Sequence, residues 1–155
     1  MESISVFEII KVGIGPSSSH TMGPWNAAEM FLEEIKKFQS LQNVKEIYVE
    51  FFGSLAKTGV GHGTDIAAML GLSGENFKEI DTDTIDVKIA EIKNSSQLNL
   101  GGEKILPFVY GENLILNMEK SLDFHPNGMI FKAIFENGEI LERDYYSVGG
   151  GFVAT

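Results

Sequence analysis

Three histidines are the only imidazoles of the chain, and each lies among turn-forming residues rather than on an apolar periodic face. His20 follows a run of serines, His62 stands between two glycines, and His125 precedes a Pro-Asn-Gly sequence. An imidazole titrates near neutral pH and can serve as a general base or as a metal ligand. Placement in a loop favours such a role, and an exposed histidine without a function is the alternative for each.

The serine-rich segment 17–21 offers hydroxyl groups, backbone N–H groups and one imidazole directly before a predicted helix. Unpaired N–H groups and the helix dipole favour anions at that position, so the segment suits a carboxylate or a phosphate. Ser17, Ser18, Ser19 and Thr21 supply the hydroxyl groups, and His20 supplies the imidazole. A helix cap made by Ser19 or Thr21 explains the same pattern equally well.

A second segment, 59–65, surrounds His62 with glycines and ends in Gly63, Thr64 and Asp65. It lacks the Gly-Lys-Ser/Thr ending of a Walker A loop and does not match the dinucleotide-binding fingerprint. Flanking glycines let a substrate approach the ring closely, which suits a general base. Thr64 or Asp65 has a simpler interpretation as the cap of the next helix.

His125 and Asn127 predict first of all a turn before a strand, because proline fixes one dihedral angle and Asn-Gly tolerates positive φ. A zinc site built from the three histidines is a weaker alternative, since they lack the short ligand spacing of such sites. A serine hydrolase ranks lower still, because the sequence contains no Gly-x-Ser-x-Gly. We therefore predict no metal ligands on this chain.

The composition limits the possible partners. A formal net charge of −10 argues against a nucleic-acid partner and against binding to an anionic membrane. The absence of cysteine excludes disulfides, a thiolate nucleophile and a cysteine-bound cluster on this chain. No basic segment precedes an apolar stretch at the N-terminus, and no apolar run is long enough to span a membrane, so we expect a cytoplasmic protein. A length of 155 residues predicts one domain over 1–155.

The elements that must position these segments are those of an α/β (α+β) protein, with helices packed on a mixed or antiparallel sheet. We predict helices over 5–11, 24–39, 64–70 and 83–94. Thr21 or Gly23 caps the second of these, Pro24 lies in its first turn, and Gly71 ends the third.

Strands are predicted over 44–52, 104–110, 113–118, 129–135 and 139–146. A turn at 111–112 joins the second and third of these, and Asn137-Gly138 is the two-residue turn that joins the last two. The glycines at 149–151 favour a close backbone approach or a tight bend.

Several of these stretches together resemble the β domain of bacterial iron–sulfur L-serine dehydratases. The matching stretches, in order, are 5–9, 13–24, 53–56, 61–65, 125–129 and 145–152. The Ser-Ser-Ser-His-Thr and Gly-His-Gly-Thr-Asp sequences are the most specific of them, whereas residues 75–120 carry no recognised motif. The resemblance also implies a fold similar to the allosteric substrate-binding domain of D-3-phosphoglycerate dehydrogenase.

The resemblance implies the reaction of an L-serine ammonia-lyase, which converts L-serine to pyruvate and ammonia. It implies a [4Fe-4S] cluster held by the cysteines of a separate catalytic α domain, where one iron activates the serine hydroxyl. It makes His62 the leading candidate for the base that removes the α proton, with Gly63, Thr64 and Asp65 beside it. It places Ser17, Ser19, His20 and Thr21 around the substrate carboxylate or amino group. His125 and Asn127 receive weaker roles.

Because the chain has no cysteine, it cannot hold the cluster, and we expect the isolated chain to be inactive. It is also too short to include the regulatory domain that some β subunits carry. A regulatory module that binds a small anion or an amino acid without catalysis is the alternative from another functional class. Assembly as a homodimer and the choice between serine and threonine stay open.

Overall fold

The structure is a computed structural model that describes residues 18–57, 63–117, 128–149 and 152–154. Its helices are α2 (Ser18–Phe38), α3 (Gly53–Lys57), α4 (Thr64–Leu72) and α5 (Ile85–Ser95), with the short 3-10 helices η1 (Leu41–Asn43) and η2 (Thr82–Thr84). Its strands are β1 (Val44–Phe52), β2 (Gln97–Leu100), β3 (Lys104–Pro107), β4 (Leu114–Asn117), β5 (Gly128–Phe135), β6 (Ile140–Gly149) and β7 (Phe152–Ala154). The helix predicted over 5–11 lies outside the described residues.

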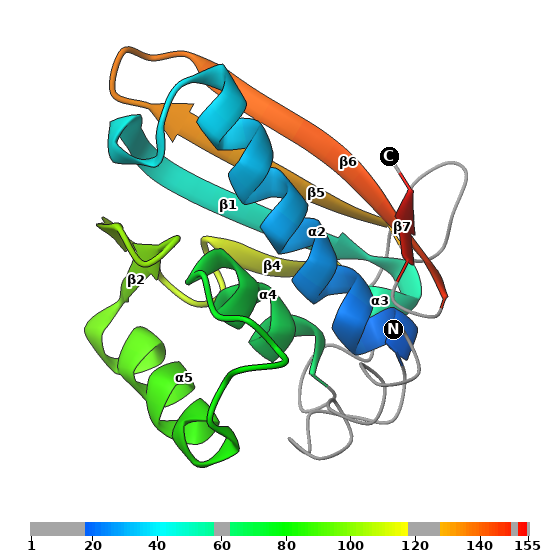
Figure 1. Cartoon of the computed structure of the whole chain (residues 1–155). Helices are drawn as coiled ribbons and strands as arrows, with labels where there is room; N and C mark the ends of the chain where they lie inside the picture. Colours follow the sequence, from blue (N-terminus) through cyan, green and yellow to red (C-terminus); the bar gives the residue numbers. More distant parts are fainter. Residues whose placement is uncertain (1–17, 58–62, 118–127, 150–151, 155) are drawn as a thin grey trace.

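A five-stranded mixed sheet in the order β4-β1-β5-β6-β7 forms the frame of the molecule (Figure 1). β4 runs parallel to β1, and the other neighbours are antiparallel. β2 and β3 pair with each other in a separate two-stranded sheet. The predicted α+β class with a mixed sheet is confirmed, and the similarity to the dehydrogenase domain stays a prediction.

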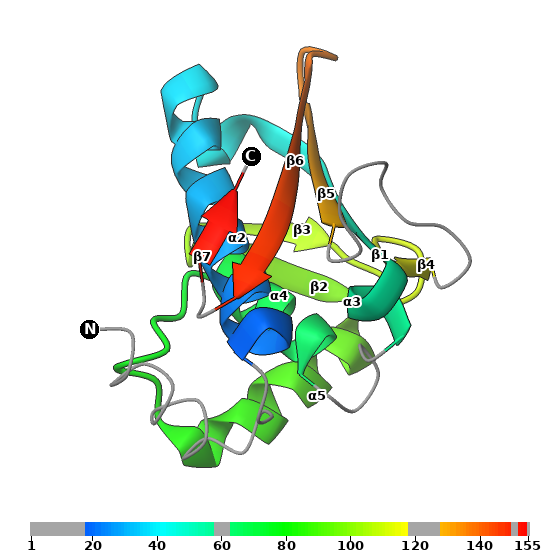
Figure 2. The same cartoon turned by 90° about the vertical axis from the view of Figure 1, so that its right-hand side faces the viewer.

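Helix α2 covers one face of the large sheet (Figures 1 and 2). Phe31 packs its ring 5.5 Å from that of Phe131 on β5, and Phe38 in the last turn packs 5.4 Å from Phe135 at the end of that strand. Such aromatic pairs bury large areas and fix the direction of the helix on the sheet. The two contacts orient α2 along β5, with the end of the helix beside the end of the strand.

The predicted start of this helix near Pro24 was wrong. α2 begins at Ser18, and Pro24 lies inside it. Proline lacks the N–H that would bond the carbonyl four residues earlier, which normally ends or bends a helix. Here buried residues on both sides, Met22 and Trp25, anchor the turns before and after Pro24 in the core. Tertiary packing thus overrides the local signal.

Gly71 does not end α4 as predicted, because the helix continues to Leu72. A Cβ atom at Gly71 would lie 2.7 Å from Ala28 Cβ and 3.0 Å from the Trp25 carbonyl oxygen. Real Cβ atoms do not approach so closely, so glycine is what allows α4 to lie directly against α2. Gly71 therefore allows the close contact between α2 and α4 and does not mark the end of α4.

The predicted pairing of 104–110 with 113–118 was also wrong. β3 pairs with β2, whereas β4 pairs with β1, where Val49 faces Leu114. The buried side chain of Asn113 stabilises the point where the chain passes from the small sheet to the large one. Its Oδ1 accepts from the Val109 N–H at 2.8 Å, and its Nδ2 donates to the Ile47 carbonyl at 2.9 Å. One amide therefore joins the turn to β1 and prevents a simple hairpin.

The hairpin of β5 and β6 is confirmed, but its loop is longer than predicted. The Gly138 N–H donates to the Phe135 carbonyl at 2.9 Å, and the Phe135 N–H donates to the Glu139 carbonyl at 2.9 Å. Gly138 has φ of +91°, in the left-handed region. A three-residue loop with glycine in that region is a common alternative to the two-residue turn. Asn137-Gly138 is thus the second part of a three-residue loop.

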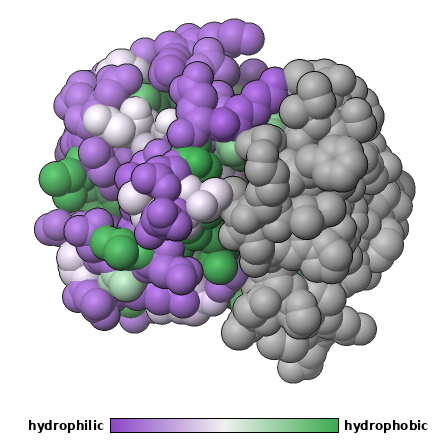
Figure 3. All heavy atoms as spheres, turned by 60° about the horizontal axis from the view of Figure 1, so that its bottom comes forward, coloured by the Kyte–Doolittle hydropathy of each residue, from purple (hydrophilic) through white to green (hydrophobic). Residues whose placement is uncertain are grey.

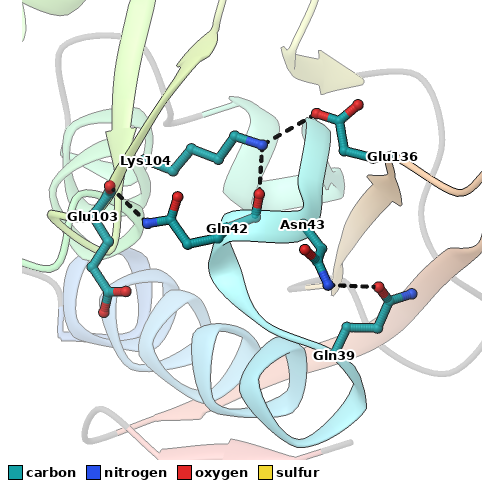
Figure 4. Close-up of polar contacts among 6 residues, drawn as sticks. All are labelled: Gln39, Gln42, Asn43, Glu103, Lys104 and Glu136. Carbon is teal, nitrogen blue, oxygen red and sulfur yellow. Dashed lines mark hydrogen bonds and ion pairs between the residues drawn. The ribbon is translucent and has the colours of Figure 1, made fainter.

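Beside this hairpin loop, a group of polar contacts joins the two sheets (Figure 4). Lys104 of β3 donates to the Gln42 carbonyl at 2.6 Å and lies 3.2 Å from a carboxylate oxygen of Glu136. Gln42 in turn donates to the Glu103 carbonyl at 3.0 Å. These contacts hold the small sheet and η1 against the β5–β6 loop.

The described surface in Figure 3 is mostly hydrophilic, and its hydrophobic spheres stand in small separate groups. Val87, Ile105 and Ile140 are the most exposed large hydrophobic residues, at 58%, 62% and 58%. They come from three different elements, α5, β3 and β6. Within the described ranges, no helix is both long enough and apolar enough to cross a membrane.

Candidate functional site

The long strands of the large sheet begin or finish together at one end of the sheet, along the strand direction. Because β1 and β4 are parallel, both finish at this end, where Phe52 faces Asn117. β5 starts there and β6 arrives there, since Gly128 pairs with Tyr146. We name this end of the sheet the loop end. α3 follows β1 directly, so it also lies at the loop end.

The helices that carry the predicted site segments start at the same end. The last turn of α2 packs on Phe135, which is the far end of β5, so the first turn at Ser18 lies at the loop end. Figures 1 and 2 both show the starts of α2 and α4 at the end of the molecule that α3 occupies. The fold therefore brings together the described starts of α2, α4 and β5, which adjoin the three predicted segments.

The predicted site residues are described to different degrees. Ser17, His62, His125 and Asn127 lie outside the described residues. Ser19, His20 and Thr21 belong to the first turns of α2, not to a loop before it, and their side chains are not described. Gly63, Thr64 and Asp65 are fully described, so they carry the geometry of the site.

These three residues form the buried start of α4. Gly63 occupies the N-cap position with φ of +100°, a conformation that favours glycine, and it accepts a hydrogen bond from the Ala67 N–H at 2.8 Å. Thr64 is fully buried, and Asp65 is only 3% exposed. The predicted capping position therefore belongs to Gly63 rather than to Thr64 or Asp65.

The Asp65 carboxylate is held on both oxygens. Its Oδ1 accepts from the Ile66 N–H at 2.8 Å, which satisfies one of the unpaired N–H groups in the first helical turn. Its Oδ2 accepts from the Tyr110 hydroxyl at 2.5 Å. A carboxylate near a helix N-terminus is also favoured by the helix dipole. Asp65 thus stabilises the start of α4 from within the helix.

Tyr110 was not predicted as a site residue from the sequence. Burial raises the pKa of its hydroxyl well above the ordinary value, and the hydrogen bond to Asp65 raises it further, so the hydroxyl stays a donor at neutral pH. The Lys93 ammonium lies 4.3 Å from the centroid of the Tyr110 ring. Asp65 and Tyr110 are 45 residues apart in the chain, and Tyr110 stands in a region without a motif, so a single sequence gives no signal that links them.

A second polar pair lies at the loop end itself. The Asn117 side chain donates to a carboxylate oxygen of Glu50 at 3.0 Å, and both residues are partly buried. The bond links the last residue of β4 to β1, next to the point where both strands finish. It fixes the strand end from which the chain leads towards His125.

A groove of about 830 Å³ lies away from this site, between the end of α4, α5 and the small sheet. Its lining includes Glu75, Lys88 and Glu91, and the Lys88 ammonium is paired with Glu75 at 2.9 Å. Two carboxylates against one ammonium do not favour a small anion there.

The described residues also bear on metal binding. Among them, no three His, Cys, Asp or Glu side chains lie close enough together to hold a metal ion. The whole sequence lacks cysteine, so a cysteine-held iron–sulfur cluster does not fit the residues of this chain. The zinc alternative depends on the three histidine side chains, which lie outside the described residues.

A family model described as the serine dehydratase beta chain matches residues 5–155. The chain belongs to this family. The resemblance expected from the 17–21 and 61–65 segments is thereby confirmed.

Three relatives at 43% identity are longer than this chain. The L-serine dehydratases of Streptomyces coelicolor and Haemophilus influenzae are each 43% identical over 152 residues, which cover 97% of this chain and 33% of the relative. The L-serine dehydratase of Mycobacterium tuberculosis is 43% identical over 155 residues, covering 99% of this chain and 33% of the relative. This β chain spans about one third of the length of the curated relatives that it matches, at 33%.

Proposed function

We propose that this β chain forms one part of the active site of an L-serine dehydratase, which converts L-serine to pyruvate and ammonia. The observation that carries the proposal is the family match over 5–155, together with relatives named L-serine dehydratase at 43% identity. The fold supports it, because the starts of α2, α4 and β5 meet at the loop end.

The partner in this proposal is a cysteine-containing catalytic α domain or subunit. It corresponds to the part of the relatives that this chain does not cover, since the chain accounts for 33% of their length. The [4Fe-4S] cluster belongs to that partner, because this chain has no cysteine to hold it. The isolated β chain is then inactive.

His62 is the proposed general base. It removes the proton from Cα of L-serine, and the β hydroxyl leaves with a proton as water. The resulting aminoacrylate takes up water and yields pyruvate and ammonia. An imidazole suits this step because its ordinary pKa lies near neutral pH. Gly63 follows His62 directly and precedes a helix start that is buried and hydrogen bonded.

The proposed binding site for the substrate carboxylate is the start of α2. This helix has 21 residues, and its N-terminal N–H groups and dipole favour an anion. Ser17, Ser19, His20 and Thr21 are the proposed binding residues of this site. His125 and Asn127 precede β5 at the loop end and are weaker candidates.

The test is reconstitution. The β chain is combined with the cysteine-containing domain under anaerobic, iron-replete conditions, and pyruvate formation from L-serine is measured. His62→Ala should lower kcat by about 100-fold or more, the usual contribution of a general base. Lys37→Ala, on the exposed face of α2, is the control and should keep full activity.

Full activity of the His62 variant would exclude His62 as the base. Binding of L-serine without turnover in the reconstituted complex would instead favour the regulatory module. Comparison of L-serine with L-threonine in the same assay determines the substrate preference.

A further inference from the structure

We propose that Tyr110 is a positioning residue for the active site, because its hydroxyl holds the Asp65 carboxylate and thereby fixes Gly63 and Thr64 at the start of α4. The catalytic consequence rests on the proposed function, whereas the structural step does not. Tyr110 acts through Asp65 and is not proposed to touch the substrate.

The first step of the argument is the buried carboxylate. Asp65 is only 3% exposed, and a buried carboxylate is costly unless donors reach it. The Ile66 N–H serves one oxygen from within the helix, at 2.8 Å. The Tyr110 hydroxyl serves the other from a distant part of the chain, at 2.5 Å. Tyr110 is therefore the described contact that ties this carboxylate to the rest of the fold.

Tyr110 is itself supported from two sides. Its backbone forms a β-bridge with Leu114, the first residue of β4, which belongs to the large sheet. Its ring lies 4.3 Å from the Lys93 ammonium, which belongs to α5. An ammonium over an aromatic ring adds attraction and restricts the orientation of the ring. Sheet and helix together hold the hydroxyl in place.

The third step links Asp65 to the segment before it. Gly63 and Thr64 precede Asp65 directly, and the Gly63 carbonyl is bound by the Ala67 N–H one turn later. These contacts make 63–67 one small hydrogen-bonded unit that Tyr110 anchors. Reacting groups require placement within a fraction of an ångström, and small displacements lower the rate strongly. A looser anchor would then lower turnover without removing any group that contacts the substrate.

Tyr110→Phe tests this in the reconstituted complex, since it keeps the ring and removes the hydroxyl alone. We expect kcat per folded site to fall by about tenfold, with KM changed by less than about twofold. Tyr48→Phe is the matched control, because its hydroxyl also donates to a carboxylate, that of Glu46, at 2.7 Å on β1. The control should keep the wild-type kcat.

A merely structural tyrosine would lower the folded fraction and leave kcat per folded site unchanged. An unchanged kcat in Tyr110→Phe, or an equal fall in Tyr48→Phe, would overturn the proposal.

Amide hydrogen exchange in the same complex separates this proposal from the proposed function. In Tyr110→Phe, the amides of 64–67 should exchange about tenfold faster, and those in the second half of α2 should be unchanged. If wild-type protein does not turn over L-serine, the proposed function fails and the exchange result still decides the anchoring step. Unchanged exchange at 64–67 would contradict it.

Discussion

Replacing Gly71 with alanine tests the contact between α2 and α4. The added Cβ would lie 2.7 Å from Ala28 Cβ, 3.0 Å from the Trp25 carbonyl oxygen and 3.2 Å from Trp25 Cδ1. Two of these neighbours are parts of the α2 backbone or attached directly to it, so they cannot rotate away. Carbon atoms prefer separations of about 3.5–4.0 Å, so the helices would have to separate by about 1 Å.

Two effects of opposite sign determine the free energy of unfolding. Alanine in a helix interior is more favourable than glycine by about 1 kcal/mol. An extra methyl group in a packed interior costs about 1–3 kcal/mol through displaced neighbours. Because the close neighbours at Gly71 are rigid, we expect the upper part of that range and a net loss of about 1–2 kcal/mol. For a chain of this size, that corresponds to a fall in Tm of about 2–8 °C.

Thermal and urea unfolding, followed by circular dichroism, would measure this loss. The double variant Gly71→Ala with Ala28→Gly removes the closest contact, so it should be more stable than the sum of the two single effects predicts. A stability gain of about 1 kcal/mol in Gly71→Ala alone would match helix propensity. Such a gain would refute the reasoning from close contact.

Two further variants test other features. Tyr145 is 1% exposed, and its hydroxyl has no hydrogen-bond partner among the described residues. Tyr145→Phe should therefore raise the free energy of unfolding, measured with urea, by about 1 kcal/mol. A loss of stability would indicate a partner elsewhere in the chain. Burial raises the pKa of this hydroxyl from 10.0 to about 12, so wild-type stability should fall as pH rises from 10.0 towards 12, and Tyr145→Phe should weaken that fall. In the β5–β6 loop, Gly138→Ala places a side chain at φ of +91° and should cost about 1–2 kcal/mol in thermal unfolding, whereas unchanged stability would contradict the assigned loop conformation.

Local patterns in the sequence were enough to predict several elements. β1 has the predicted limits, 44–52, because six of its nine residues are β-branched or aromatic and Gly53 follows them directly. α5 and the β5–β6 hairpin were also predicted from short-range signals. These elements depend mainly on neighbours in the sequence, so periodicity and turn residues describe them well.

The errors arose where distant residues decide the structure. Pro24 lies inside α2 because the turns around it are packed in the core. Gly71 lies inside α4 because a residue without Cβ allows close contact with Ala28. β2 was not predicted, and β4 joined β1 instead of β3 through the Asn113 amide. No local pattern reports such contacts, because each depends on where another element finally packs.

The candidate site shows the same division. The segments around His20 and His62 stood out by their residue types, and their order along the chain led to the family that the comparisons confirmed. The support behind Asp65 was not predictable, since Tyr110 and Lys93 come from a region without a motif. Chemistry-bearing residues were thus visible in the sequence, but the residues that hold them were not.

The strand order also has a consequence for self-association. The strands at the two sides of the large sheet are short, with four residues in β4 and three in β7, whereas the inner strands β1, β5 and β6 have nine, eight and ten. Long unpaired strand edges are templates on which another chain can add a strand, and short ones offer few free N–H and C=O groups. β4 pairs with β1 only over 49–52, and β7 pairs with β6 only over 146–149. Among the described residues, the first parts of β1 and β6 therefore have no strand neighbour on that side. If copies of this chain associate by extending the sheet, we expect the added strand to pair with 140–145 of β6.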